Sequence, residues 1–302
     1  MADHVEWSTL FLIAVSLSGW LGAGLIWQTN LWWLSLPVMA VLATLYASLQ
    51  HETIHGHPTR FAWLNEAMVS LPLGVLFPYR RYRDLHLKHH NDSNLTDPFE
   101  DPESYFWPLS HYNMMRPFMR RVFQFNNTFV GRLLIGPVLT IIGFSRTEWA
   151  RLRAAEPGVR VAWLMHTAGL VLLFAIVIQL FAMPVWVYIV GVVYPAASLT
   201  AMRAYAEHQA AENIGGRSAI VETNALFSLL YLNNNLHIVH HAHPQLPWYD
   251  LPALYRERKH NYLAANDHLL FKGYGDIALR FAFTVKQPVD HPFLHRDDQV
   301  AG

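Results

Sequence analysis

The chain contains no cysteine and few charged residues. The absence of cysteine among 302 residues excludes disulfides, thiolate-ligated zinc, iron–sulfur clusters and cysteine nucleophiles. Only 15% of the residues are charged, against about 25% in an average soluble domain. Because 53% are apolar, this depletion favours an integral membrane protein. Any metal that binds must take nitrogen or oxygen ligands.

The chain also lacks a net charge. Lysine and arginine number 22, as do aspartate and glutamate, so no overall field favours nucleic acid or another polyanion. Residues 1–7 are mildly acidic and lack the basic stretch of a secretory signal. No internal repeat or low-complexity segment stands out. A single membrane domain over residues 1–302 is therefore expected.

Four long uncharged runs are expected to cross the membrane as two helical hairpins. They are residues 10–27, 31–49, 161–183 and 184–202. Each is long enough to span about 30 Å of hydrocarbon, and tryptophans near the ends of the first pair are typical of a membrane interface. The shorter stretches 61–79 and 133–144 are expected to be re-entrant or interfacial helices, with six spans as the alternative. The expected fold class is an all-α integral membrane protein with about four transmembrane helices.

Arginines are concentrated between residues 80 and 160, whereas neither hairpin tip carries a basic residue. The positive-inside rule therefore places these segments and both termini in the cytoplasm. Residues 51–160 and 204–287 are expected to form a helical cytoplasmic cap that holds a histidine-rich di-metal site. The charged tail, residues 288–302, is expected to be frayed.

Three histidine clusters fall on the predicted cytoplasmic side. Their members are His51 and His55, then His86, His89 and His90, then His237, His240 and His241. Positions i, i+3 and i+4 share one face of an α-helix, so each cluster is expected to aim its imidazoles at one point. Imidazole is a common ligand of iron, zinc, copper and nickel. Clustered neutral imidazoles without a metal would leave donors and acceptors in conflict, so the pattern predicts a metal centre.

Two other functional classes fit parts of this pattern. Residues 51–55 read H-E-T-I-H, which matches the zinc-binding H-E-x-x-H of metalloproteases, with Glu52 as general base. A membrane zinc metalloprotease is therefore an alternative, although its zinc would use only three protein ligands. A transporter would place ionisable groups near the bilayer midplane, where this chain has mainly His166. His166 is expected to form a hydrogen bond between helices.

The set of three clusters resembles the histidine boxes of the membrane fatty acid desaturase superfamily. Those boxes read His-x(3,4)-His, His-x(2,3)-His-His and His/Gln-x(2,3)-His-His, and here they stand in the same order between the expected hairpins. The resemblance extends from the first span to about residue 260, and residues 233–252 are most similar to bacterial acyl desaturases. It implies two iron ions, O₂ as co-substrate, electrons from an external donor, and a location in the bacterial inner membrane.

The resemblance also implies the ligands. All eight box histidines become metal ligands, and a ninth is expected at His208, between the last span and the third box. His57 and His243 lie two residues beyond their boxes, which is a turn of about 200° on a helix, so both are expected to point away from the metals. An inward turn of His57 is the alternative if Gly56 ends the helix.

A ligated imidazole usually donates its other N–H to a carboxylate or a carbonyl, which fixes the tautomer. The acidic residues near the boxes that are expected to accept it are Glu52, Asp84, Asp92, Asp97 and Glu207. Asn235, or its neighbours Asn233 and Asn234, is expected to cap a helix or to hold a metal-bound water. Residues 97–102 are expected to form a turn.

The expected activity is O₂-dependent oxidation of unactivated C–H bonds of a lipid, for which iron suits and redox-inactive zinc does not. A fatty acyl desaturase is the first expectation, and a carotenoid hydroxylase or ketolase, or another lipid hydroxylase of the superfamily, is the alternative. A separate ferredoxin- or cytochrome-like carrier and its reductase are implied, docking on the basic cytoplasmic face. Arg80, Arg81 and Arg83 are expected to anchor the chain at the membrane or to hold an anionic head group.

Overall fold

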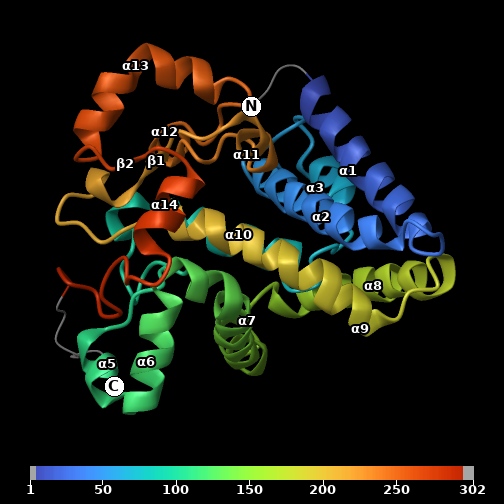
Figure 1. Ribbon diagram of the computed structural model, residues 1–302, viewed down its shortest axis with the longest axis horizontal. Helices are drawn as coiled ribbons and strands as arrows, with labels where there is room; N and C mark the ends of the chain where they lie inside the picture. Colours follow the sequence, from blue (N-terminus) through green and yellow to red (C-terminus); the bar gives the residue numbers. More distant parts are fainter. Residues whose placement is uncertain (1–4, 295–302) are drawn as a thin grey trace. The chain divides into compact units, whose positions relative to one another are not determined.

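The computed structural model describes residues 5–294, and most of them are helical (Figure 1). Five helical stretches in this part of the chain are long and apolar enough to cross a membrane. They are α1 (Trp7–Ile26), α2 (Trp32–Ile54), α7 (Phe129–Arg153), Val159–Leu180 and Val185–Glu207. The all-α membrane fold class is confirmed.

The last two of these stretches contain turns of π-helix. The first is α8 (Val159–Ala175) followed by η2 (Ile176–Leu180). The second is α9 (Val185–Tyr188), η3 (Ile189–Val193) and α10 (Tyr194–Glu207). Together they form the second of the two expected hairpins.

The third stretch, α7, contains residues 133–144, which were expected to form a helix too short to span. The helix continues through the polar residues on both sides of this apolar segment and reaches 25 residues. Hydropathy alone marks only its middle, because the flanking arginines do not prevent helix formation. Whether four or five of these helices span the membrane stays a prediction.

Residues 61–79 form the short helix α3 (Ala62–Met68) and irregular turns, which fits the expectation that they do not span. Hydrogen bonds attach these turns to the second hairpin. His166 Nε2 donates to the carbonyl of Val75 over 2.9 Å, and the Tyr188 hydroxyl donates to the carbonyl of Leu73 over 2.8 Å. His166 thus forms a buried hydrogen bond, but to an irregular turn and not between two helices as expected.

The chain divides into two compact units, each built from separate segments. Unit 1 comprises the chain up to Asp84, Pro137–Thr200 and Leu229–Leu232, and unit 2 comprises Leu85–Gly136, Ala201–Ser228 and the chain from Asn233. The boundaries fall within helices and loops rather than at linkers. The expectation of one continuous desaturase-like domain stays a prediction.

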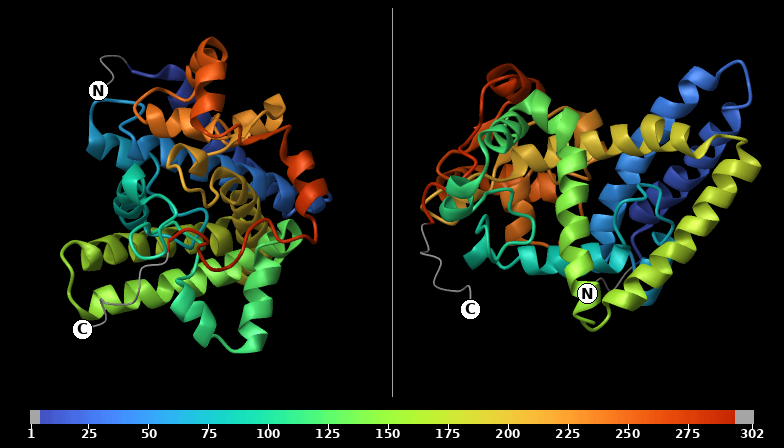
Figure 2. Two further views of the ribbon diagram at one scale, coloured as in Figure 1. Left: turned by 90° about the vertical axis from the view of Figure 1, so that its left-hand side faces the viewer. Right: turned by 90° about the horizontal axis from the view of Figure 1, so that it is seen from below.

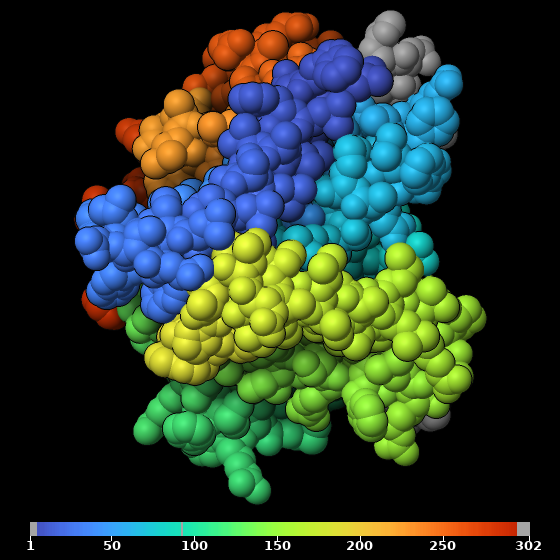
Figure 3. All heavy atoms as spheres, turned by 90° about the vertical axis from the view of Figure 1, so that its right-hand side faces the viewer, coloured from blue at the N-terminus to red at the C-terminus, as the bar shows by residue number. Residues whose placement is uncertain are grey.

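Unit 1 is organised around the hairpin of α1 and α2, which lie side by side (Figure 1). Trp20 packs edge-on against Phe181 and Tyr188, with ring centroids 5.1 and 6.1 Å away. Gly24 makes room for Phe181, because a Cβ there would lie 2.3 Å from its ring. One face of this unit brings α1 and the start of α2 beside α9 (Figure 3). Exposed apolar side chains on these helices, which suit lipid contact, include Phe11, Trp32, Trp33 and Trp186.

Unit 2 consists mainly of short elements. In chain order its 3₁₀ turns, helices and strands are η1 (Asp92–Asn94), α5 (Leu109–Met114), α6 (Pro117–Asn126), η4 (Gly215–Arg217), β1 (Ile220–Val221), α12 (His237–Ala242), α13 (Leu251–Ala265), β2 (Leu270–Phe271) and α14 (Tyr274–Phe281). The helices α4 (Tyr79–His89) and α11 (Ala225–Leu230) cross the unit boundary in the sequence. Helices α5 and α6 form a small hairpin (Figure 2).

An apolar cluster fixes α12 in unit 2. Val239 of α12 packs with Ile220 of β1 and with Leu251 and Tyr255 of α13. The two strands β1 and β2 are parallel, with Ile220 opposite Leu270. This packing positions the third histidine box, although α12 itself has only six residues.

The start of the expected frayed tail is packed rather than loose. Val289 and His291 are buried, and the backbone N–H of Trp107 donates to the carbonyl of Val289 over 2.9 Å. The N–H of His291 donates in turn to the carbonyl of Trp107 over 3.0 Å. Charge content misses this contact because it depends on backbone groups. The remaining tail residues, 295–302, lie outside the described part of the chain.

Candidate metal centre

Seven histidines of unit 2 converge in two groups. The three-histidine group consists of His86, His90 and His240. The Nε2 atom of His90 lies 3.0 Å from Nε2 of His86 and 3.2 Å from Nε2 of His240. His86 and His240 are buried.

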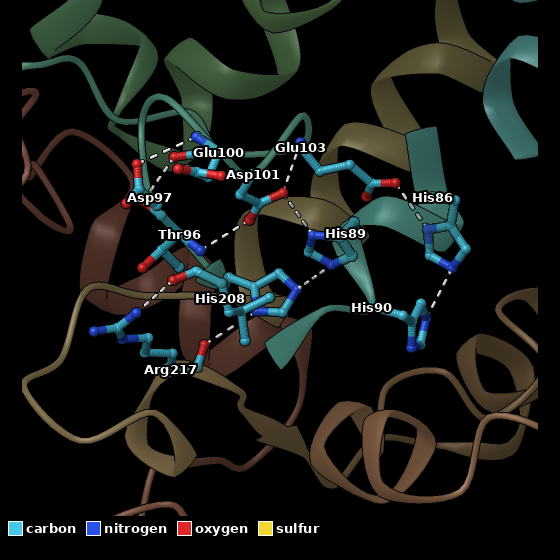
Figure 4. Close-up of polar contacts among 12 residues, drawn as sticks. His86, His89, His90, Thr96, Asp97, Glu100, Asp101, Glu103, His208 and Arg217 are labelled. Atoms are coloured by element: carbon cyan, nitrogen blue, oxygen red, sulfur yellow. Dashed lines mark hydrogen bonds and ion pairs between the residues drawn. The ribbon is translucent and has the colours of Figure 1, made fainter. Parts of the chain in front are cut away.

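The four-histidine group consists of His89, His208, His237 and His241. One ring nitrogen from each lies within 4.8 Å of the others. Nε2 of His208 is 3.0 Å from Nε2 of His89 and 2.8 Å from Nε2 of His237. Nε2 of His237 is also 3.1 Å from Nε2 of His241. The position of His208 beside His89 is visible in Figure 4.

The second and third histidine boxes are each divided between the two groups, contrary to the expectation that one box aims at one point. His86 and His90, four residues apart, share a group, whereas His89 joins the other one. The reason is helical geometry, since consecutive residues are separated by about 100° around the axis. His237 and His241 likewise share a group, and His240 joins the other.

In four of these seven histidines the Nδ1 atom faces an acceptor. His86 Nδ1 lies 2.8 Å from Glu103 Oε1, and His89 Nδ1 lies 2.8 Å from Asp101 Oδ1 (Figure 4). His208 Nδ1 donates to the main-chain carbonyl of Arg217 over 3.1 Å. A carbonyl can only accept, so the proton of neutral His208 is on Nδ1 and its Nε2 carries a lone pair.

His237 is held in the same tautomer. Its Nδ1 lies 3.2 Å from Asn234 Oδ1 and 3.4 Å from Glu207 Oε1, and Asn234 donates to that carboxylate over 2.7 Å. The lone pairs of His208 and His237 therefore face each other across 2.8 Å. Two acceptors at this distance repel each other unless a cation lies between them.

Protons alone do not resolve this conflict. Burial lowers the pKa of His89, but Glu103 and Asp101 outweigh it and raise this pKa to about 9, so a proton can lie between His89 and His208. Burial and the neighbouring imidazoles lower the pKa values of His208 and His237 well below the usual range. These two histidines stay neutral, and their donor set fits a metal ion.

Comparison with known proteins agrees with this geometry. The family model of fatty acid desaturases matches residues 30–272, which include all three boxes and His208. The chain belongs to the fatty acid desaturase family. A search of curated proteins found no match. Membership and the histidine groups together support a di-metal oxidoreductase of the desaturase and hydroxylase type.

The first box of this member of the desaturase family lies in unit 1, at the end of α2. The rings of His51 and His55 are 5.0 Å apart between centroids, and His51 is buried. Glu52 has a different environment, since its Oε1 lies 3.9 Å from Nε2 of His57. Glu6, Glu52 and His57 form a separate buried cluster. His243 directly follows α12 and is in neither group, and its expected orientation away from the metals stays a prediction.

Two carboxylates that contact ligands were missed by the sequence analysis. Asp101 lies in the segment expected to be only a turn, and Glu103 follows it. Asp101 also accepts from the backbone N–H groups of Thr96 and Glu103, over 2.8 and 2.9 Å, so it fixes both the loop and His89. The signal available in the sequence was the acidic run directly after the second box.

The other acidic residues that were expected to accept a hydrogen bond from a ligand imidazole have different environments. Glu207 contacts His237 as expected. Asp97 accepts from the backbone of Phe99 and Glu100, over 2.8 and 3.2 Å, and forms the expected turn. Asp84 is half-exposed and instead pairs with Arg81 and Arg83, which lie on the same helix. The side chain of Asp92 lies outside the described part of the chain.

Of the three asparagines before the third box, the middle one faces a ligand. Asn234 contacts His237, whereas Asn235 donates to the carbonyl of Val221 over 2.8 Å and Asn233 donates to that of Trp248 over 2.9 Å. Asn235 therefore joins α12 to β1 instead of supporting a ligand directly.

The arginines expected at a lipid head group are paired with carboxylates. Arg81 is buried and donates to both carboxylate oxygens of Glu148, over 2.8 and 2.9 Å. Arg80 pairs with Glu66, and Arg83 pairs with Asp84. These contacts favour an anchoring role.

Proposed function

We propose that this desaturase-family protein is an O₂-dependent di-iron oxidoreductase that introduces a double bond into a fatty acyl chain. The observation that carries the proposal is the convergence of Nε2 atoms in unit 2, with a carboxylate, carbonyl or amide oxygen on Nδ1 of His86, His89, His208 and His237. The proposed ligands are His51, His55, His86, His89, His90, His208, His237, His240 and His241.

When bound, the two iron ions supply O₂ activation and oxidation of the C–H bond. The protein residues fix the tautomers of the histidines and keep them buried. Asp101 and the carbonyl of Arg217 hold protons on the outer nitrogens of His89 and His208, so that the inner nitrogens remain available. Burial of His86, His89 and His237 excludes water from the ligands.

The proposed substrate reaches the site from the bilayer. An acyl chain is proposed first, because residues 233–252 resemble bacterial acyl desaturases. A carotenoid oxidised by the same centre would give a hydroxylated or ketolated product instead. The proposed location is the bacterial inner membrane, with the histidine site on the cytoplasmic side, where the arginine-rich segments lie under the positive-inside rule.

Electrons must come from a separate carrier. The chain has no cysteine, so it cannot hold an iron–sulfur or rubredoxin site of its own. We expect a ferredoxin- or cytochrome-like protein with its reductase, attracted by the basic residues of the cytoplasmic segments.

The first test is the metal content of the detergent-purified chain. We expect about two iron ions per chain, in line with the two histidine groups. His208→Ala should lose iron, and the matched control His260→Ala, which alters an exposed histidine of α13, should retain it. Lipid profiling of expressing cells then separates acyl from carotenoid products.

One zinc ion per chain without iron, after iron-replete expression, would overturn the proposal in favour of a membrane protease. Glu52→Gln would then abolish peptide cleavage, because the general base is lost.

A further inference from the structure

Residues 286–291 of unit 2, here called the C-terminal segment, contact the supports of two proposed ligands, His89 and His208. The segment lies beyond residue 272, where the match to the desaturase family ends, so family membership assigns it no role. Its His291 side chain is fully buried. A buried imidazole requires hydrogen-bond partners, and these partners indicate what the segment does.

Hydrogen bonds fix the tautomer of His291. Its Nδ1 accepts from the backbone N–H groups of Phe293 and Leu294, over 3.2 and 3.0 Å. An imidazole nitrogen that accepts carries no proton, so the proton of neutral His291 is on Nε2. Nε2 lies 3.2 Å from the hydroxyl oxygen of Thr96 and donates to it. His291 therefore reaches from the C-terminal segment to the loop that carries Asp101.

Thr96 has an unusual backbone conformation. Its φ is +65°, in the left-handed region, which β-branched residues rarely adopt. Such a conformation persists only where the surrounding structure holds it. His291 contacts the Thr96 hydroxyl, and the Ser104 hydroxyl donates to the Thr96 carbonyl over 2.8 Å. Held in this way, the Thr96 N–H donates to Asp101 Oδ2 over 2.8 Å.

The carboxylate of Asp101 connects this contact to a proposed ligand. Its Oδ2 accepts from Thr96, and its Oδ1 lies 2.8 Å from His89 Nδ1 (Figure 4). Thr96, Asp101 and His89 are all buried, so water does not readily replace a contact that is lost here. The orientation of the His89 ring thus depends on Thr96 and, one step further, on His291.

The other end of the C-terminal segment holds the backbone around His208. Lys286 Nζ donates to the carbonyl of His208 over 2.9 Å. The side-chain amide of Gln287 pairs with both backbone groups of Ala210, accepting over 2.8 Å and donating over 3.1 Å. Because Nε2 of His89 and Nε2 of His208 are only 3.0 Å apart, the segment supports both sides of this contact.

We propose that His291 is a positioning residue of the metal centre, which acts on His89 through Thr96 and Asp101. The inference rests on the proposed function, in which His89 is a ligand. The Nε2–H of His291 keeps Thr96 in its left-handed conformation, and the Thr96 N–H keeps Asp101 turned toward His89 Nδ1. The C-terminal segment is therefore part of the centre, although none of its residues is among the proposed ligands.

Two substitutions at position 291 separate the bond to Thr96 from the bonds to the tail. His291→Gln keeps an N–H donor near the place of Nε2 but loses the acceptor at Nδ1. His291→Asn keeps an acceptor near the place of Nδ1 but is too short to reach Thr96. The matched control is His260→Asn, the same change at an exposed histidine of unit 2.

The experiment measures the Co²⁺ affinity of the whole chain in detergent by competition with a chelator, and the melting temperature of the metal-free protein. His291→Asn should lower the affinity about 10-fold, whereas His291→Gln and His260→Asn should retain most of it. His291→Gln should lower the melting temperature at least as much as His291→Asn, because it releases the tail. With Asp101→Asn already present, His291→Asn should cause no further loss of affinity.

Equal losses of affinity in His291→Asn and His291→Gln would overturn the proposal, because they would identify tail packing as the cause. An unchanged affinity in His291→Asn would overturn it as well. So would additive losses from His291→Asn and Asp101→Asn, since His291 would then act by another route. None of these results touches the proposed function, which fails instead if the parent chain binds no Co²⁺.

Discussion

In unit 1 the packing centres on large apolar side chains, such as Trp20 against Phe181, within helices of 20 residues or more. In unit 2 the histidine groups lie on short elements, and the six residues of α12 include three of the converging histidines. A helix this short is not stable by itself in water. Long apolar helices can therefore form from burial and backbone hydrogen bonds, whereas the histidine groups of unit 2 depend on buried polar contacts and on the proposed metal.

The largest difference between the two units is expected when the metal is removed. After chelation, we expect backbone amides of α12 and of the loop 96–104 to exchange hydrogen much faster, because the repelling imidazoles are no longer held together. Amides in the middle of α1 and α2 should keep their protection. Hydrogen-exchange mass spectrometry of the loaded and stripped protein in detergent measures both. Equal loss of protection in the two units would show that they do not differ in this way.

The next largest effect is expected from Asp101→Asn, which changes a single contact to His89 of unit 2. The amide keeps the size of the side chain but removes the charge that faces His89 Nδ1, so metal affinity should fall about 10- to 100-fold. Competition with a chelator of known affinity measures the change. Asp97→Asn, in the neighbouring turn, is the matched control and should have a much smaller effect. If Asp97→Asn lowered the metal affinity more than Asp101→Asn, Asp97 would be the carboxylate that supports metal binding.

Gly24→Ala tests the packing of unit 1 alone. The new methyl group would meet the ring of Phe181 at 2.3–2.5 Å, so we expect a loss of about 1–3 kcal/mol in the free energy of unfolding. Gly22→Ala, on the same helix, has open space around its Cβ and should be neutral or slightly stabilising. Thermal unfolding in detergent compares the two. Metal binding in unit 2 should not change in either variant.

The smallest effect is expected at the surface of unit 2. Lys259, which donates to Glu222 over 2.6 Å, lowers the pKa of this carboxyl, and Tyr255 also donates to it. A lowered folded-state pKa stabilises the protein above the unfolded-state pKa of about 4.3, and this contribution is lost as pH falls through the folded value.

Because Glu222 and Lys259 are both more than one-third exposed, the contribution should be below about 1 kcal/mol. Glu222→Gln should therefore lower the melting temperature slightly at pH 7 and not at pH 3. A difference that persists at pH 3 would point to packing rather than charge.

The long elements could be predicted from the sequence because each is defined by its own composition. The four apolar runs correspond to helical stretches of the structure, and the three boxes locate most of the metal-facing histidines. His208 was predicted from the family resemblance alone, because no other histidine lies three or four residues from it in the sequence.

The supporting contacts could not be predicted in the same way. Asp101 and Glu103 reach their histidines through a loop, and loop paths are not encoded by periodicity. Asn234, rather than Asn235, faces His237 because the backbone turns at Asn233, which has a φ of +56°. The packing of Val289 and His291 likewise depends on a backbone pair with distant Trp107.

The main-chain partner of His208 has a consequence for engineering. Any amino acid at position 217 presents the same carbonyl to Nδ1, so neither a substitution scan nor sequence covariation would report this contact. The loop is held in place by the backbone bridge between His208 and Ser218 and by the Arg217 guanidinium, which donates to the carbonyls of Leu95 and Ala211. A designer who grafts the nine histidines onto another scaffold must also copy the course of the chain from 208 to 218. Otherwise this imidazole is free to flip its tautomer.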